Sequence, residues 1–221
     1  MKLGLIADVH ADVEALRLAL DRLDALGAGA VLCAGDLVDY GFWPDETISL
    51  VRARDIPCVL GNHDRRLFTR PPEKRKPRHS DPDAITPENL KYLRALPARL
   101  DRRYGGLRVA VHHGALTSDT ALVHPKFSTP RALAEMIEAS RANVLVLGHT
   151  HVPVHFVAPA GRLINPGSLF VHHDTGRYTS RTFGVLDTET LDYRLYDVVS
   201  GVEHPQTTWL WWKDQTPADE A

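Results

Sequence analysis

Hydrophobic residues form short runs that alternate with longer stretches in which they recur every three or four positions. Short runs predict strands, and the longer periodicity predicts helices. From the N-terminus we expect a strand at residues 2–7, a helix at 12–27, a strand at 30–34, a helix at 44–54 and a strand at 56–60. Asp12 is a candidate N-cap of the first helix, and Gly27 is placed to end it. This alternation is typical of an α/β fold whose first strands run parallel.

The second half of the chain shows a different pattern. We expect a helix at residues 88–96, a hairpin with strands at 98–104 and 107–112, a helix at 129–142 and a strand at 143–147. Short strands then follow one another at residues 152–157, 161–165, 181–187 and 191–198. Because short turns join the first two of these strands and the last two, each of these pairs favours antiparallel pairing. The fold class is therefore α/β with mixed sheets.

A stretch rich in proline and charge separates the two halves. Residues 65–78 hold seven basic side chains and a single acidic one, Glu73. We interpret residues 65–88 as a lid or loop insertion in a single domain of residues 1–209, followed by a C-terminal tail at 210–221. Two interpretations of the basic stretch stay open: it contacts a polyphosphate or nucleotide, or it is a solvated loop.

Composition narrows the class of protein. The chain has 221 residues, 43% of them hydrophobic and 24% charged, with a net charge of -2, which suits a soluble single domain. The start of the chain does not resemble a signal peptide, and no apolar run reaches the roughly 20 residues of a membrane span. We therefore expect a cytoplasmic protein without a membrane partner. The near-neutral charge makes nucleic acid an unlikely partner, although the basic stretch keeps a nuclease open.

Other residues have less specific patterns. Cys33 and Cys58 lie in apolar runs and are interpreted as buried small hydrophobic residues. The tryptophans Trp209, Trp211 and Trp212 are expected to pack on the domain or to form a contact between subunits, so a homo-oligomer stays open.

Candidate chemistry gathers where the predicted strands end. Each of several apolar runs is followed by polar residues: Asp8 and His10, Asp36, Asn62 with His63 and Asp64, His113, and His149 with His151. The carboxyl ends of parallel strands meet at one edge of a sheet, so these side chains should converge. Oxygen and nitrogen donors without a thiolate suit Mn, Fe, Zn or Ni. The set is too large for one ion, so we expect two divalent ions that share a carboxylate.

The ordered set "DVH", "GD", "GNHD", "HHG" and "GHTH" resembles the motifs of the calcineurin-like metallophosphoesterases. The stretches "GDLVDYGFWPDETISLVRARDIPCVLGNHD" and "INPGSL" resemble its small bacterial single-domain phosphodiesterase branch. Tyr40 stands where the protein-phosphatase branch carries an arginine, which argues against that branch. The resemblance implies a four-layer αββα sandwich with a dinuclear metal centre.

The resemblance also implies a role for each residue. Ligands of the first metal would be Asp8, His10 and His151, ligands of the second would be Asn62, His113 and His149, and Asp36 would bridge them. His113 is preferred to His112 because the family's histidine directly precedes glycine. A metal-bridging hydroxide would attack phosphorus, while His63 contacts the phosphate and assists the leaving group and Asp64 orients His63.

The function expected from these residues is metal-dependent hydrolysis of a phosphate ester, with manganese favoured. Our first expectation is a phosphodiesterase acting on small nucleotide-like esters. Alternatives are a phosphomonoesterase or a hydrolase of dinucleoside polyphosphates such as diadenosine tetraphosphate. An alternative from another class is a non-catalytic scaffold with the same fold. Such scaffolds typically lose metal ligands or the active-site histidine, and both are present here.

Overall fold

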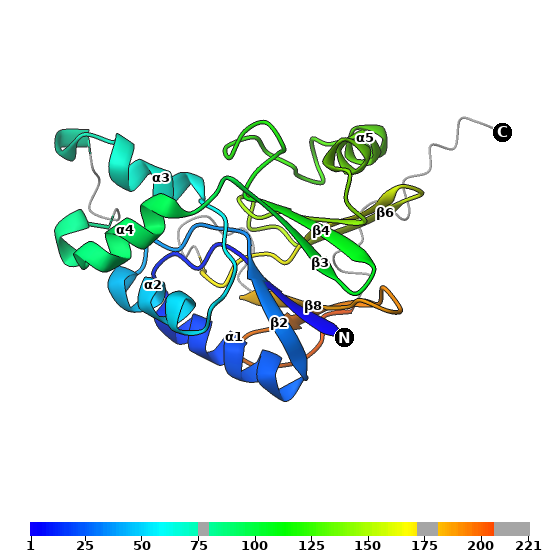
Figure 1. Ribbon diagram of the computed structural model, residues 1–221, viewed down its shortest axis with the longest axis horizontal. Helices are drawn as coiled ribbons and strands as arrows, with labels where there is room; N and C mark the ends of the chain where they lie inside the picture. Colours follow the sequence, from blue (N-terminus) through cyan, green and yellow to red (C-terminus); the bar gives the residue numbers. More distant parts are fainter. Residues whose placement is uncertain (75–79, 172–180, 206–221) are drawn as a thin grey trace.

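The computed structural model describes residues 1–74, 80–171 and 181–205. Two mixed β-sheets pack face to face, and helices cover the outer face of each sheet (Figure 1). The four layers confirm the predicted αββα sandwich. The predicted tail after residue 209 and the three tryptophans lie outside the described residues.

The first sheet contains the N-terminal strand. Its members, in spatial order, are β2 (Ala28–Cys33), β1 (Lys2–Ile6), β8 (Thr182–Asp187) and β9 (Tyr193–Asp197). β1 runs parallel to β2 but antiparallel to β8, and β8 runs antiparallel to β9. The N-terminal strand therefore meets strands of residues 182–197 in one sheet, and the carboxyl ends of β1 and β2 lie at the same edge.

The second sheet contains the central strands. Their spatial order is β3 (Arg99–Tyr104), β4 (Leu107–His112), β5 (Val144–Val146), β7 (Gly161–Asn165) and β6 (Val154–Ala158). β4, β5 and β7 are parallel, whereas the β3–β4 and β6–β7 pairs are antiparallel hairpins. The hairpin around Gly105 is confirmed, and the carboxyl ends of β4 and β5 also share one edge.

The helices begin where the sequence places capping residues. They are α1 (Val13–Ala25), α2 (Pro44–Ala53), α3 (Asn62–Thr69), α4 (Pro87–Ala95) and α5 (Pro130–Ser140), with 3-10 turns at Pro72–Lys74 and Pro82–Ala84. Asp12 accepts a hydrogen bond from Ala15 N at 3.0 Å, as expected of an N-cap. Thr86 and Thr129 cap α4 and α5 in the same way.

Three hydrophobic cores hold the layers together. Leu16, Leu20 and Leu23 of α1 pack against the outer face of the first sheet. Leucine, valine and isoleucine side chains from both sheets fill the space between them. Leu133 and Ile137 of α5 pack on the outer face of the second sheet. Hydrophobic burial on both faces explains why the parallel strands are nearly continuous apolar runs.

Two predicted elements differ from the structure. Residues 56–60 form no strand; Cys58 only makes an isolated parallel bridge with Cys33, and Pro57 has no N–H to donate to a ladder. Residues 65–69, expected to begin a loop, continue helix α3. Leu67 is buried there, so this part of the basic stretch is anchored in the hydrophobic core.

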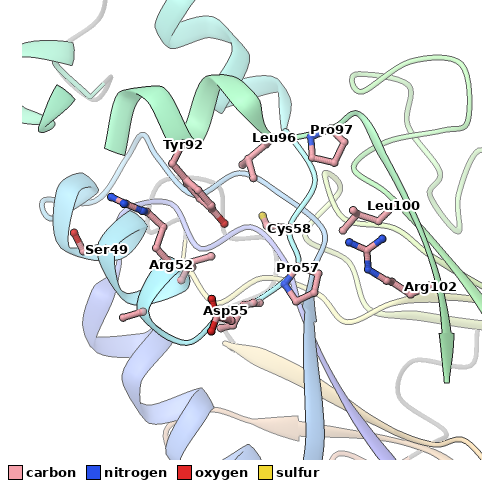
Figure 2. Close-up of a pocket in the computed structure, with 13 residues that line it drawn as sticks. Ser49, Arg52, Asp55, Pro57, Cys58, Tyr92, Leu96, Pro97, Leu100 and Arg102 are labelled. Atoms are coloured by element: carbon pink, nitrogen blue, oxygen red, sulfur yellow. The ribbon is translucent and has the colours of Figure 1, made fainter. Parts of the chain in front are cut away.

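A hollow of about 780 Å³ lies between α2, α4 and the start of β3 (Figure 2). The ring of Tyr92 lies within it, with the Arg52 guanidinium 5.7 Å from the ring centroid. It shares no residue with the strand-end side chains. In the part of the chain that the structure describes, no helix combines the length and the apolar composition needed to cross a membrane.

Candidate metal centre

The strand-end side chains of both sheets converge on one rim. Asp8 and His10 follow β1, Asp36 follows β2, His113 follows β4, and His149 and His151 follow β5. Asn62 is the first residue of α3. Two groups have donor atoms that all lie within 4.8 Å of one another: Asp8, His10 and His151, and Asp8, Asp36 and His113. The structure thus brings together residues that lie up to 143 positions apart in the chain.

The first group is built around two imidazole nitrogens. His10 Nε2 and His151 Nε2 are 3.0 Å apart, and His151 Nε2 lies 3.4 Å from Asp8 Oδ1. His10 and Asp8 are fully buried. Nitrogen and carboxylate donors directed at one another in this way match the ligand chemistry of a divalent transition metal.

The Asn62 amide lies beside the second group. Its oxygen lies 3.0 Å from His113 Nε2. The same amide position lies 2.8 Å from His149 Nδ1. With the oxygen turned inward, several lone pairs face one another, an arrangement that a cation between them would stabilise. Turning the amide nitrogen inward would instead let it donate to both histidines. The Asn62 amide can therefore donate hydrogen bonds to the two histidines or, turned the other way, offer its oxygen to a cation.

Asp8 belongs to both groups, and Asp36 is the member of the second group that faces the first. Its Oδ2 is 3.1 Å from His113 Nε2 and 3.9 Å from His10 Nε2. Its Oδ1 accepts a hydrogen bond from the backbone N–H of His63 at 2.8 Å. One carboxylate oxygen is therefore fixed by the start of α3, and the other faces ligands of both groups, which is the geometry needed of a shared ligand.

The far nitrogens of three histidines are engaged by the backbone. His10 Nδ1 donates to Val38 O at 3.0 Å, and His113 Nδ1 donates to Ala34 O at 2.7 Å. His149 Nε2 donates to Thr120 O at 3.1 Å. Each bond fixes the tautomer and leaves the other ring nitrogen with a lone pair directed into the site. Histidines that bind metals are usually held in this way, so these residues fit the ligands of a divalent metal.

Burial and charge set the protonation of these groups. Burial lowers the pKa of His10 to about 3, even though Asp36 opposes it, so the ring is neutral. Burial also lowers the pKa of His113, but the Asp36 carboxylate outweighs this effect and raises the pKa to about 10. Burial raises the pKa of Asp36, but His113 and His10 outweigh it and hold the pKa well below the usual value. His10 and Asp36 thus already have the protonation that metal ligands need, whereas His113 carries a proton beside Asp36 that a metal would have to displace.

The loops that carry the ligands have unusual backbone angles. Positive φ values, between 49° and 71°, occur at a run of non-glycine residues in these loops: Asp8, His10, Ala11, Asp36, Asp39, Tyr40, His149 and His151. L-residues seldom adopt this region, and functional sites are where such strain is commonly kept. Gly61 shows how crowded the site is, because a Cβ there would overlap the Asp36 carboxylate.

The carboxylate that contacts His63 is Asp39, not Asp64 as expected. His63 Nδ1 donates to Asp39 Oδ2 at 2.9 Å. Asp64 instead accepts from backbone N–H groups, at 2.9 Å from Gly61 and 2.8 Å from Leu37. As the third residue of α3, Asp64 lies too close to the start of the helix to reach its neighbour's ring, and it fixes the loop after β2.

Two more side chains contact this arrangement. Ser80 clasps Asp39: its N–H donates to Asp39 Oδ1 at 2.7 Å, and its hydroxyl accepts from Asp39 N at 2.9 Å. Arg66, one turn along α3, has Nη1 3.0 Å from His63 Nε2. Ser80 and Arg66 lie in no recognisable sequence motif. Asp39, in contrast, is the second aspartate of "GDLVD", so its place in that motif is a signal that could have pointed to it.

The stretch "INPGSL" braces the ligand loops. Asn165 donates to Gly148 O at 2.7 Å and to Thr150 Oγ1 at 3.1 Å, both in the loop that carries His149 and His151. Ser168 Oγ donates to Asp8 O at 2.8 Å. The sequence identifies this stretch only by resemblance, and its contacts show that it supports the loops that carry the candidate ligands Asp8, His149 and His151.

His112 is buried away from the two donor groups. In the described residues its Nε2 has no hydrogen-bond partner, and the neighbouring His113 faces Asp36. Alternation along a strand directs successive side chains to opposite faces, so the choice of His113 agrees with the geometry.

Comparisons with known proteins agree with this geometry. The profile of the calcineurin-like phosphoesterase superfamily domain matches residues 1–191. The uncharacterized protein MJ0912 of Methanocaldococcus jannaschii is 24% identical over 181 residues, covering 78% of this chain and 71% of that protein. A metallophosphoesterase from Sphaerobacter thermophilus superposes with a TM-score of 0.72 at 25% identity, covering 89% of this chain and 87% of that one.

A third likeness is to a protein named for sorting rather than for hydrolysis. Vacuolar Protein Sorting 29 from Cryptosporidium parvum has a TM-score of 0.58 at 17% identity, covering 92% of this chain and 94% of its own. That likeness concerns the fold alone. The family match spans the strands and loops that supply every candidate ligand. On this evidence the chain belongs to the calcineurin-like phosphoesterase superfamily.

Proposed function

We propose that this protein is a dinuclear metal-dependent phosphodiesterase that hydrolyses small nucleotide-like phosphate esters. The observation that carries the proposal is the pair of donor groups with Asp36 between them. When bound, two divalent ions would activate a water molecule as nucleophile and neutralise charge on the phosphoryl oxygens. Among Mn, Fe, Zn and Ni we favour Mn, because the set has carboxylate, amide and imidazole donors and no thiolate.

The chain's own residues would handle the leaving group. His63 Nδ1 donates to Asp39, and Nε2, which faces the site, accepts from Arg66 Nη1; Nε2 would hold a proton for the leaving group once Arg66 turns to the phosphoryl oxygens. Transfer of that proton to the departing oxygen would let the bond between phosphorus and oxygen break without releasing an alkoxide. Asp39 would act as a positioning residue, since it touches His63 and not the substrate.

The proposed function includes a cellular location and a class of substrate. We place the activity in the cytoplasm on small phosphate esters, with nucleic acid and membranes outside its substrates. Phosphomonoesters and dinucleoside polyphosphates are the nearest alternatives. A homo-oligomer is compatible with this proposal, because the donor groups come from one chain.

The alternative to an enzyme is a non-catalytic scaffold with the same fold. The likeness to Vacuolar Protein Sorting 29 is the observation that raises this alternative. A scaffold needs neither a complete ligand set nor an oriented histidine. This chain brings its candidate ligands together and holds His63 against Asp39. Those features support the enzyme over the scaffold.

The deciding experiment replaces Asp36. Asp36→Asn should lower bound metal and turnover together, because Asp36 belongs to the second donor group and its Oδ2 also faces His10 of the first. Metal content is measured by plasma mass spectrometry, and turnover with bis(4-nitrophenyl) phosphate after loading with Mn, Fe, Zn or Ni. His63→Ala should keep its metal but lose at least about 100-fold in kcat. Asp101→Asn on the exposed strand β3 is the matched control and should resemble the wild type.

Two results would contradict the proposal. Wild-type metal content in Asp36→Asn would remove the shared-ligand role. A metal-loaded wild type that hydrolyses no mono- or diester in a panel that includes dinucleoside polyphosphates and cyclic nucleotides would favour the scaffold.

A further inference from the structure

Two side chains outside the donor groups contact the His63 ring. Arg66 Nη1 lies 3.0 Å from His63 Nε2, the nitrogen that faces the site. The ring of Tyr40 lies 4.8 Å from the His63 ring, tilted by 49°. Both side chains are half-buried. Anything that approaches His63 from the rim therefore meets a cation and an aromatic ring.

Arg66 carries a charge that no neighbouring carboxylate balances. Across residues 1–74, 80–171 and 181–205, its guanidinium forms no ion pair; its polar neighbours are His63 and the Asn62 amide. The adjacent Arg65, by contrast, is paired with Asp119 at 2.7 Å. A half-buried guanidinium without an anion, beside a site for anionic esters, is suited to bidentate contact with phosphoryl oxygens.

Tyr40 belongs to a larger aromatic surface. Its ring stacks with Phe170, with centroids 5.9 Å apart and planes 24° apart. Both rings meet the ligand His10 edge-on, Tyr40 at 4.8 Å and Phe170 at 5.8 Å. We call Tyr40 and Phe170 the aromatic wall. It lies beside the first donor group and against His63, so aromatic surface borders the reacting centre itself.

We infer that Arg66 binds the phosphoryl oxygens while the aromatic wall binds the leaving group, so that the enzyme selects esters whose leaving group carries an aromatic ring. This inference rests on the proposed phosphoesterase function. In hydrolysis, water forms a bond to phosphorus and releases a proton to the solvent, the ester bond breaks, and the leaving oxygen takes a proton from His63, which the solvent then replaces. The leaving group must then lie next to His63, where Tyr40 lies. Stacked or edge-on contacts between aromatic rings stabilise such a complex beyond the burial of apolar surface.

The kinetic test compares two diesters that differ only in the leaving group. Methyl phenyl phosphate and methyl hexafluoroisopropyl phosphate release alcohols of similar acidity, so leaving-group chemistry is matched. The metal-loaded wild type should favour the phenyl ester about 10-fold in kcat/KM. Tyr40→Leu should bring this ratio close to one, and Tyr40→Phe should restore it. Phe42→Leu is the control, because Phe42 is an exposed aromatic residue that contacts Trp43.

A binding test gives a readout that does not depend on turnover. Calorimetry would measure the affinities of the metal-loaded protein for phenylphosphonate and for methylphosphonate. The wild type should prefer phenylphosphonate, and Tyr40→Leu and Phe170→Leu should each reduce that preference. Arg66→Ala should weaken both phosphonates by a similar factor of about 10 and leave their ratio unchanged. Circular dichroism checks that each variant is folded.

The outcomes separate this inference from the proposed function. Hydrolysis of both esters with a ratio that Tyr40→Leu and Phe170→Leu leave unchanged overturns the inference and keeps the phosphoesterase. A Tyr40-dependent preference for phenylphosphonate without any hydrolysis keeps the aromatic subsite and overturns the proposed function. A wild type that neither binds nor hydrolyses these compounds overturns both.

Discussion

Both carboxylate oxygens of Asp39 are held by neighbouring residues, and its backbone is left-handed. It follows β2 by six positions, has φ of 71°, and directs one carboxylate oxygen to His63 and the other to Ser80 N. With both oxygens engaged, the carboxylate has little freedom to rotate. The orientation of His63 is thus fixed through Asp39 by a residue 41 positions further along the chain.

Replacing Asp39 tests this arrangement. Asp39→Asn keeps the size of the side chain but removes the charge that favours a proton on His63 Nδ1. We expect kcat to fall by about 100-fold or more, while bound metal stays at the wild-type level, because Asp39 lies outside both donor groups. Ser80→Ala should produce a smaller loss in the same direction. Steady-state kinetics and metal analysis measure both effects, and loss of metal in Asp39→Asn would contradict the assignment.

The candidate ligands could be predicted residue by residue, whereas their supporting contacts could not. Asp8, Asp36 and His113 each follow an apolar strand and are residue types that bind metals, so sequence position alone identifies them. The partner of His63 depends on a left-handed backbone at Asp39 and on Ser80, and neither leaves a periodic pattern. The contact of Arg66 with His63 could not be predicted either, because the sequence shows Arg66 as one of seven basic residues in the stretch 65–78.

At the scale of elements, α3 shows how tertiary contacts override local composition. Basic residues and the prolines beyond them favour a loop from Arg65 onward. The helix forms because Asp64 accepts from Gly61 N at its start and Leu67 is buried on its inner face. Its first residues are Asn62 and His63, so the helix itself presents a candidate ligand and the candidate acid.

The junction between α2 and α4 offers a test of stability away from the metal centre. Asp45 Oδ1 accepts from Thr86 N at 2.7 Å and from Asn89 Nδ2 at 2.8 Å, which ties the beginnings of the two helices together. Asp45→Ala should lower the free energy of unfolding by about 1 kcal/mol, since these bonds are partly exposed. Metal content should remain unchanged. Urea unfolding at constant metal concentration measures the difference.

Acid should reduce the contribution of Asp45. Burial acts upward on its pKa, but the bonds from Thr86 and Asn89 outweigh it and lower the pKa. A carboxylate with a lowered pKa in the folded state stabilises the fold fully above its ordinary pKa of 3.8 and loses that contribution as the pH falls through the folded-state value. The stability difference between wild type and Asp45→Ala should therefore shrink in acid. A constant difference from pH 7 to pH 2 would refute this contribution.

At the scale of the whole molecule, the two donor groups draw on both sheets. The first sheet supplies Asp8, His10 and Asp36, and the second supplies His113, His149 and His151. The alternation of strands with helices predicted the α/β class from sequence, whereas the four layers were implied by the resemblance to the calcineurin-like metallophosphoesterases. The pairing of β1 with β8 could not be predicted in this way, since it joins residues nearly the whole chain apart.

Removing metal should therefore lower the stability of the whole domain. An ion present at 100 times its dissociation constant stabilises the folded state by about 2.7 kcal/mol. For a chain of this length, that corresponds to a fall in Tm of roughly 5–10 °C on chelation. Differential scanning calorimetry with and without chelator measures the shift, and Asp36→Asn should show little of it. An unchanged Tm in the chelated wild type would show that folding and metal binding are independent.

The core between the two sheets would influence which ion the candidate site prefers. Because the candidate ligands follow strands on opposite sides of that core, its thickness would set how far apart the two halves of a coordination shell stand. Ala7 lies in this core and directly precedes Asp8. Relatives that differ only in the bulk of such interlayer side chains would thus diverge in ionic-radius preference while keeping identical ligands.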